Sequence, residues 1–195
     1  MRIGILGGTF DPPHIGHLVI AEQARDQLCL DVVIFVPAYL PPHKMKGASA
    51  DAKQRLAMTR MATKNSPNFR VSPVELKRKG VSYTIDTINA LREQYPSAKL
   101  FVIMGGDNFR QFDTWKSATH IRDMATIVVY ERSGVRSKNE HIRQKHLIVL
   151  KGAVLDISST IIRQRVHRGE SIQYLVPSAV HSYIRANKLY QSPAR

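Results

Sequence analysis

The sequence predicts an α/β fold, in which a doubly wound parallel sheet carries helices on both faces. Short apolar runs of four to six residues alternate with longer stretches whose apolar residues recur every three or four positions. The 195 residues, 43% of them hydrophobic and 23% charged, suffice for one domain with a sizeable core. In addition, glycine pairs follow two of the apolar runs directly, as turns do at the ends of buried strands.

Five apolar runs have the length and composition of buried strands. They are Arg2–Leu6, Asp31–Val36, Leu100–Met104, Ala125–Tyr130 and Leu147–Leu150, and a short extended segment is predicted at Phe69–Val71. Parallel sheets bind ligands beyond the carboxyl ends of their strands, near the point where the strand order reverses. The turns Gly7-Gly8 and Gly105-Gly106-Asp107 each follow a strand, so we expect both at one crevice.

Helical periodicity predicts the elements between and after these strands. The predicted helices run from near Ile15 to Leu28, from a cap at Asp51, over Tyr83–Tyr95, from Ser158 through Val166, and over Pro177–Ala186. The polar and basic segment Ser133–Lys145 is predicted to be a mobile connection. We expect one domain over residues 1–190, with a small helical part at about 157–190 and a tail over 191–195.

The charge balance points to partners that carry phosphate. Lys and Arg number 29 against 15 Asp and Glu, a formal net charge of +14, which suits a nucleotide, a nucleic acid or an anionic lipid. No apolar run approaches the roughly 18 residues of a membrane helix, and no cleavable signal peptide is recognised. The single cysteine, Cys29, cannot form an internal disulfide, which favours a cytoplasmic protein with no membrane contact.

The strongest motif lies between the first strand and the first helix and reads Gly7-Gly8-Thr9-Phe10-Asp11-Pro12-Pro13-His14-Ile15-Gly16-His17. Glycines let a backbone approach a ligand closely, and the start of a helix offers N–H groups to an anion. His14 and His17 are three apart and share a helix face, with Gly16 keeping the approach open. We therefore predict a phosphate cradle. Neither a Walker loop nor a dinucleotide fingerprint is present, and no third ligand at suitable spacing supports a metal site.

The second motif is Ile157-Ser158-Ser159-Thr160-Ile161-Ile162-Arg163. Ser158 and Ser159 suit a helix N-cap, where hydroxyl and N–H groups can meet phosphate oxygens. Arg163 lies about one turn further, on the face that the cap presents, and its guanidinium matches phosphoryl oxygens. Read alone, the segment is equally consistent with an ordinary capped helix.

Together the two motifs resemble the bacterial nicotinate-nucleotide adenylyltransferases, in the nucleotidyltransferase superfamily that carries a His-x-Gly-His turn. The similarity runs from Arg2 to about Tyr190, and between the motifs it includes Pro41-Pro42-His43-Lys44, Ser82-Tyr83-Thr84, Gly105-Gly106-Asp107 and Trp115. Gly106 departs from the pattern, because relatives often carry a side chain there. The resemblance implies a Rossmann-like fold. It also implies transfer of AMP from ATP to nicotinate mononucleotide, giving nicotinate adenine dinucleotide (deamido-NAD) and pyrophosphate in NAD biosynthesis.

The resemblance also implies roles for individual residues. His14, His17 and Arg163 would be catalytic, and the attack on the α-phosphorus of ATP would be direct and in line. The residues expected to bind ATP are Gly7, Gly8, Thr9, Phe10, His14, Gly16, His17, Gly105, Asp107, Ser158, Ser159, Thr160 and Arg163. Those expected to bind the mononucleotide are Lys44, Tyr83, Thr84, Asp107 and Trp115. Mg²⁺ would arrive with ATP, without a metal site of the protein's own.

Three alternatives stay open at this point. Phosphopantetheine adenylyltransferases share the glycine-rich start and the late Ser-Ser-Thr helix, but they usually have Thr where His14 stands. Nicotinamide mononucleotide differs from the acid by one group, so a few donors would decide the preference. A nucleic-acid-binding module is the alternative from another class: the His-x-Gly-His turn also occurs in class I aminoacyl-tRNA synthetases. However, this chain has no room for a tRNA-reading domain and no Lys-Met-Ser-Lys-Ser loop.

Overall fold

Six parallel strands form the sheet in the order β3-β2-β1-β4-β5-β6. The computed structural model describes residues 1–42, 48–130, 147–153 and 155–191, and within these the strands are β1 (Arg2–Gly8), β2 (Val32–Pro37), β3 (Phe69–Val71), β4 (Lys99–Gly105), β5 (Ala125–Tyr130) and β6 (Leu147–Val149). The predicted doubly wound α/β fold is confirmed. The predicted mobile connection at 133–145 lies outside the described residues.

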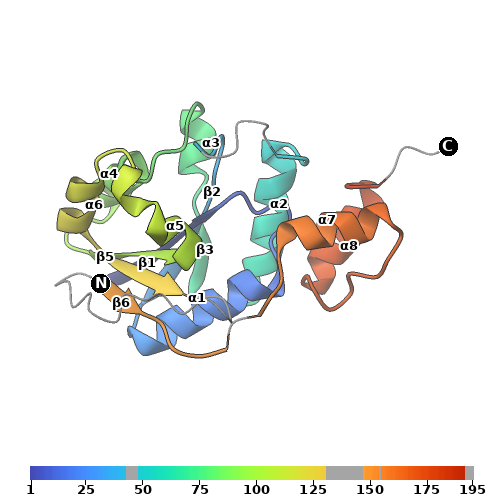
Figure 1. The fold of residues 1–195 in the computed structure, drawn as a ribbon, viewed down its shortest axis with the longest axis horizontal. Coiled ribbons are helices and arrows are strands. Elements are labelled where there is room, and N and C mark those ends of the chain that lie inside the picture. Colours follow the sequence, from blue (N-terminus) through green and yellow to red (C-terminus); the bar gives the residue numbers. More distant parts are fainter. Residues whose placement is uncertain (43–47, 131–146, 154, 192–195) are drawn as a thin grey trace.

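Helices cover both faces of the sheet (Figure 1). The longer ones are α1 (Ile15–Gln27), α2 (Ala52–Thr63), α4 (Thr84–Gln94), α7 (Ser159–His167) and α8 (Ser178–Ala186), close to their predicted positions. Four short elements were not predicted: α3 (Val74–Arg78), α5 (Gly106–Arg110), η1 (Phe112–Thr114) and α6 (Ala118–Met124). One or two turns are too few to establish a helical period in the sequence.

The central strands are buried on both faces, which is why they read as continuous apolar runs. In β2, Val33 and Phe35 pack in one core with Ala21 and Ala24 of α1. The alternate residues of β2 belong to the core on the opposite face, together with Ile88 and Leu91 of α4. The period of two along a strand thus divides one apolar run between two layers.

The C-terminal helices form a third apolar cluster away from the sheet. Ile162 of α7 and Val180 and Ile184 of α8 pack with Met58 of α2, and Figure 1 shows α7 and α8 side by side at one end of the molecule, beyond α2. The carbonyl of Leu175 accepts the N–H of Ile15 at 3.0 Å. This hydrogen bond joins the segment before α8 to the start of α1.

The strand order reverses between β1 and β4, which lie next to each other at the centre of the sheet. Leu6 is in register with Ile103, so the glycine turns that follow the two strands emerge from the same edge. This edge is where open parallel sheets bind their ligands. In the described part of the chain, no helix has the length and apolarity to cross a membrane.

Candidate active site

A cleft of about 650 Å³ opens at the carboxyl ends of β1 and β4. Its size falls in the range of small-molecule sites, roughly 300–1,000 Å³. The predicted site residues that line it are Gly7, Gly8, Thr9, Phe10, His14, His17, Tyr83, Thr84, Trp115, Ser158, Ser159, Thr160 and Arg163. Segments far apart in the sequence therefore meet at one cavity.

Three predicted site residues do not line the cleft, and a fourth lies outside the described residues. Gly16 and Gly105 do not line the cleft, and neither does Asp107, whose carboxylate pairs with Arg110 on the exposed side of α5. Lys44 lies outside the described residues. Asn108, the next residue along α5, does line the cleft.

His14 and His17 form a compact pair at the start of α1. Their ring centroids are 3.7 Å apart with an angle of 27° between the planes, and the backbone N–H of His14 donates to Nδ1 of His17 at 3.1 Å. Because Nδ1 of His17 accepts this bond, the neutral ring carries its proton on Nε2. The Phe10 ring packs edge-on against the His17 ring, with the two ring centroids 5.0 Å apart. The pair is therefore held in a fixed orientation before any ligand binds.

Two glycines make room for these rings. A Cβ at Gly16 would lie 3.0 Å from Nδ1 of His14, and a Cβ at Gly8 would lie 3.2 Å from the Phe10 ring. Phe10 itself has φ 49, in the left-handed region that non-glycine residues rarely adopt. Gly16 thus serves the packing of His14, whereas the sequence suggested that it keeps the ligand approach open.

The N-termini of three helices converge on the cleft, since the N-cap residues His14, Tyr83 and Ser158 all line it. At α4, the N–H groups of Thr84 and Ile85 meet no acceptor within the described ranges. At α1, however, the N–H of Ile15 is already bonded to Leu175. The α1 end is therefore less available to an anion than the motif suggested, and α4 and α7 contribute more of the free donors.

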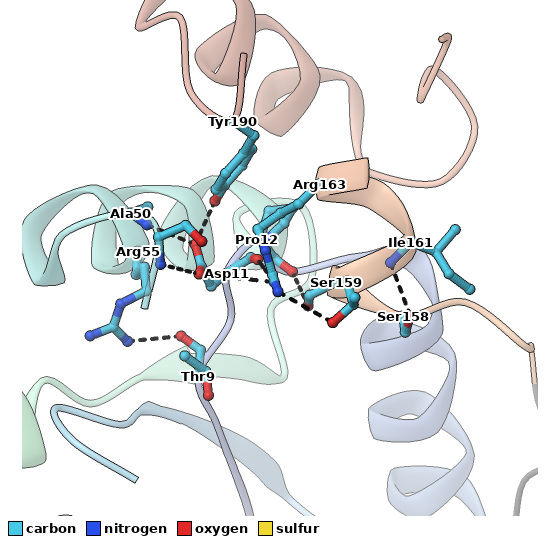
Figure 2. A network of polar contacts seen from close by, with 12 residues as sticks. Thr9, Asp11, Pro12, Ala50, Arg55, Ser158, Ser159, Ile161, Arg163 and Tyr190 are labelled. Atoms are coloured by element: carbon cyan, nitrogen blue, oxygen red, sulfur yellow. Dashed lines mark hydrogen bonds and ion pairs between the residues drawn. The ribbon is translucent and has the colours of Figure 1, made fainter. Parts of the chain in front are cut away.

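The start of α7 is tied to the loop after β1 by two hydrogen bonds. Oγ of Ser159 donates to the Pro12 carbonyl at 2.8 Å, and Nη1 of Arg163 donates to the Asp11 carbonyl at 2.8 Å. Figure 2 shows Arg163 reaching from α7 to this loop, while Ser158 accepts the N–H of Ile161 as the helix cap. The two motifs identified in the sequence thus contact each other directly.

Asp11 and Arg55 are buried charges beside this junction, 3% and 2% exposed. Nη1 of Arg55 donates to the carbonyls of Thr9 and Ala38, at 2.8 and 2.6 Å. Burial lowers the pKa of the Arg55 guanidinium, and the charge of Asp11 acts in the opposite direction. Arg55 therefore connects the residues that directly follow β1 and β2 through hydrogen bonds to their carbonyl groups. Sequence reasoning missed it because an arginine within a helical pattern usually faces solvent.

The cleft is also lined by Trp115, Tyr83 and residues around α4, and Figure 1 shows α4 on the opposite side of the molecule from α7. Nζ of Lys116 lies 4.6 Å from the centre of the Tyr83 ring. Glu75, buried on α3, accepts a hydrogen bond from Oγ1 of Thr87 at 2.5 Å. Burial raises the pKa of the Glu75 carboxyl, while bonds from Ser82 and Thr87 act to lower it. Nothing local in the sequence indicated that Glu75 would be enclosed.

The described lining residues of the cleft include as many acidic as cationic side chains. Of the described lining residues, Arg163 and Lys116 are cationic, and Asp11 and Glu75 are acidic. Net side-chain charge would therefore attract an anion to this cleft only weakly, and the helix N-termini are the groups there with the geometry to bind one. Among all the residues that the structure describes, no group of three or more His, Cys, Asp or Glu side chains could hold a metal ion.

Comparison with known proteins gives the family. Residues 5–165 match the family model described as Cytidylyltransferase-like. The chain is 41% identical over 192 residues to a probable nicotinate-nucleotide adenylyltransferase of Halalkalibacterium halodurans, covering 98% of this chain and 92% of that protein. It is 44% identical over 191 residues to a protein so described from Thermus thermophilus, covering 98% and 100%. The chain belongs to the nicotinate-nucleotide adenylyltransferase family.

Solved structures show the same fold at low sequence identity. A Plasmodium falciparum nicotinic acid mononucleotide adenylyltransferase complexed with NaAD superposes with a TM-score of 0.82 at 17% identity, over 97% of both chains. The same enzyme complexed with APC gives a TM-score of 0.78. The nicotinate-nucleotide adenylyltransferase family assignment therefore rests on the sequence relatives, and the structures establish that the fold is shared.

Proposed function

We propose that this chain transfers the AMP group of ATP to nicotinate mononucleotide, releasing pyrophosphate and nicotinate adenine dinucleotide. The phosphate of the mononucleotide attacks the α-phosphorus, an oxygen–phosphorus bond forms there, and the bond to the pyrophosphate oxygen breaks. The attacking phosphate is already ionised near neutral pH, since its second pKa is about 6. No enzyme nucleophile or general base is needed, and catalysis consists of positioning and charge stabilisation.

One observation carries this proposal: the two motifs line the same cleft as the α4 N-terminus and Trp115, and α4 and α7 lie on opposite sides of the molecule (Figure 1). A donor and an acceptor nucleotide both need room and anion-binding groups, and the cleft offers them at its two ends. Because α7 is bonded to the loop after β1, the groups proposed for the triphosphate form one rigid unit.

We assign the triphosphate to the end formed by the His pair and α7. Nε2 of His17 carries the ring proton and would donate to a phosphate oxygen, and Arg163 would pair with the departing pyrophosphate. His14, with Ser158 and Thr160, would complete this end, and the backbone of Gly7 to Phe10 would line its floor. Mg²⁺ would enter with ATP as part of the substrate, held mostly by phosphate oxygens and water.

We assign the mononucleotide to the end formed by α4 and Trp115. The N–H groups of Thr84 and Ile85, which meet no acceptor within the described ranges, would bind the nicotinate carboxylate at a helix N-terminus. Trp115 would stack on the pyridine ring. Tyr83 would help to enclose the ring, and Lys44 and Asp107 stay proposed contacts of the phosphate and the sugar. Gly16 and Gly105 would act through the backbone conformation that they allow. We also propose that the protein is cytoplasmic.

The deciding experiment measures ATP-dependent pyrophosphate release with three acceptors. We expect nicotinate mononucleotide to be used most efficiently, nicotinamide mononucleotide less well, and phosphopantetheine not at all. A kcat/KM for phosphopantetheine above that for both mononucleotides would overturn the proposal. Retention on nucleic acid that survives 200 mM salt, without any pyrophosphate release, would instead favour a nucleic-acid-binding protein.

A further inference from the structure

The carboxylate of Asp11 is enclosed by donors from three parts of the chain. Oδ2 accepts the N–H of Ser49 at 2.7 Å, and Oδ1 accepts the N–H of Ala50 at 3.1 Å and the phenol of Tyr190 at 2.8 Å. Nη1 of Arg163 lies 3.9 Å from Oδ2. Figure 2 shows Tyr190 and Arg163 approaching this carboxylate from different elements. A buried carboxylate is tolerated only with such compensation.

Tyr190 contributes to this network from the end of the described chain, 179 positions after Asp11. Burial raises the pKa of the Tyr190 phenol strongly, and the charge of Asp11 adds to the effect. The phenol therefore keeps its proton, and continues to donate, throughout the pH range in which enzymes are assayed. Neither Tyr190 nor the carboxylate of Asp11 has a role in the reaction proposed above.

The guanidinium of Arg163 is held at both of its terminal nitrogens. Nη1 is bonded to the Asp11 carbonyl at 2.8 Å and faces its carboxylate, and Nη2 donates to Oγ1 of Thr160 at 3.2 Å. The side chain is 29% exposed, so the group is anchored but still reaches the cleft that it lines. A long side chain that is ordered before the ligand arrives loses less entropy when it binds.

We propose that Asp11 and Tyr190 are positioning residues for Arg163. The Tyr190 phenol orients the Asp11 carboxylate, the carboxylate and carbonyl of Asp11 hold Nη1 of Arg163, and the guanidinium thereby stays directed at the triphosphate. The inference rests on the proposed function, because it takes Arg163 as a ligand of ATP. The Tyr190 hydroxyl, which does not line the cleft, is therefore expected to affect the binding of ATP but not that of the mononucleotide.

The test uses Tyr190→Phe in the full chain, which removes one hydroxyl and keeps the ring. The matched control is Tyr183→Phe, because Tyr183 packs against the same cluster and its hydroxyl makes no hydrogen bond within the described ranges. Calorimetry measures the Kd of a non-hydrolysable ATP analogue and, separately, of nicotinate mononucleotide. We expect Tyr190→Phe to weaken analogue binding by about three- to tenfold and to change mononucleotide binding less than twofold. Tyr183→Phe should change neither.

A double-mutant cycle separates positioning from general stability. In an Arg163→Ala background, Tyr190→Phe should cause no further loss of analogue binding, because the group it positions is gone. An equal loss in both backgrounds, or equal weakening of both ligands, would overturn the inference. Asp11→Asn should weaken analogue binding more than Tyr190→Phe does, because its side-chain amide group would face the groups that donate hydrogen bonds to the carboxylate. If the Asp11→Asn protein does not fold, the Tyr190→Phe measurements still test the positioning role.

The two proposals fail in different ways. If the wild-type chain binds the ATP analogue and Tyr190→Phe binds it equally well, the positioning role is wrong and the proposed function stands. If the wild-type chain neither binds the analogue nor releases pyrophosphate, both are wrong.

Discussion

The backbone N–H of His14 donates to Nδ1 of His17, and the two imidazole rings stack with their centroids 3.7 Å apart. The bond makes Nε2 the donor of the His17 ring, and the stacking limits its rotation. A preorganised donor stabilises developing charge more effectively than one that must reorient.

Replacing His17 should therefore slow the reaction strongly. For His17→Ala we expect kcat to fall by roughly 10²–10³, as when a single preorganised donor to transition-state charge is lost. The measurement is pyrophosphate release at saturating ATP and nicotinate mononucleotide. His120→Ala, at an exposed histidine of α6, should leave kcat unchanged. A loss below about threefold in a folded His17→Ala protein would contradict the role given to this ring.

Truncating Trp115 should separate the two substrates. Trp115→Ala removes the proposed stacking surface, and stacking on an aromatic side chain contributes about 1–3 kcal/mol per base. We expect the Kd of nicotinate mononucleotide to rise at least tenfold while that of the ATP analogue changes little. Trp115→Phe should retain much of the binding. Equal losses for both ligands in calorimetry would argue against stacking and for a structural role of the side chain, which also packs against Phe112.

Arg55 should matter for stability. Arg55→Met leaves the carbonyls of Thr9 and Ala38 without their donor and removes a positive charge near Asp11. Removing one member of a buried polar network costs about 3 kcal/mol in free energy of unfolding, measured by urea denaturation. Arg60→Met, at an exposed position of the same helix, is the control and should cost less than about 0.5 kcal/mol. Similar values for the two variants would show that the Arg55 bonds contribute little.

Glu75 should give the unfolding free energy a defined pH dependence. Because burial raises the pKa of this carboxyl in the folded protein above its ordinary 4.5, the native state binds more protons than the unfolded chain as pH rises above that value. The stabilising contribution is complete below pH 4.5 and is lost as the pH passes through the folded pKa. Denaturation of Glu75→Gln across pH 4–8 should therefore show the variant gaining stability relative to wild type as pH increases.

The control for Glu75 is Glu93→Gln, at an exposed position of α4. Its difference from wild type should stay constant over the same pH range. A constant difference for Glu75→Gln as well would mean that the folded protein does not disfavour the ionised form of the Glu75 carboxyl.

Much of the fold was predictable because local sequence patterns indicate most of its strands and longer helices. The apolar run at β2, the period of α4 and the capping residues Asp51 and Ser158 all report the conformation of their own neighbourhood. The helices α3, α5 and α6 were not predicted, since so few turns show no periodicity and tertiary packing decides whether they form.

The candidate site divides in the same way. By itself the sequence determined which residue types stand at the start of α1 and α7, because glycines, paired imidazoles and a capping serine have local geometric consequences. Only the tertiary structure decided that α1, α4 and α7 point their N-termini into one cleft, that Leu175 occupies a donor of α1, and that Tyr190 reaches Asp11. Such contacts join residues up to 179 positions apart. These contacts depend on how whole helices and strands pack against one another, and a local sequence pattern does not indicate that packing.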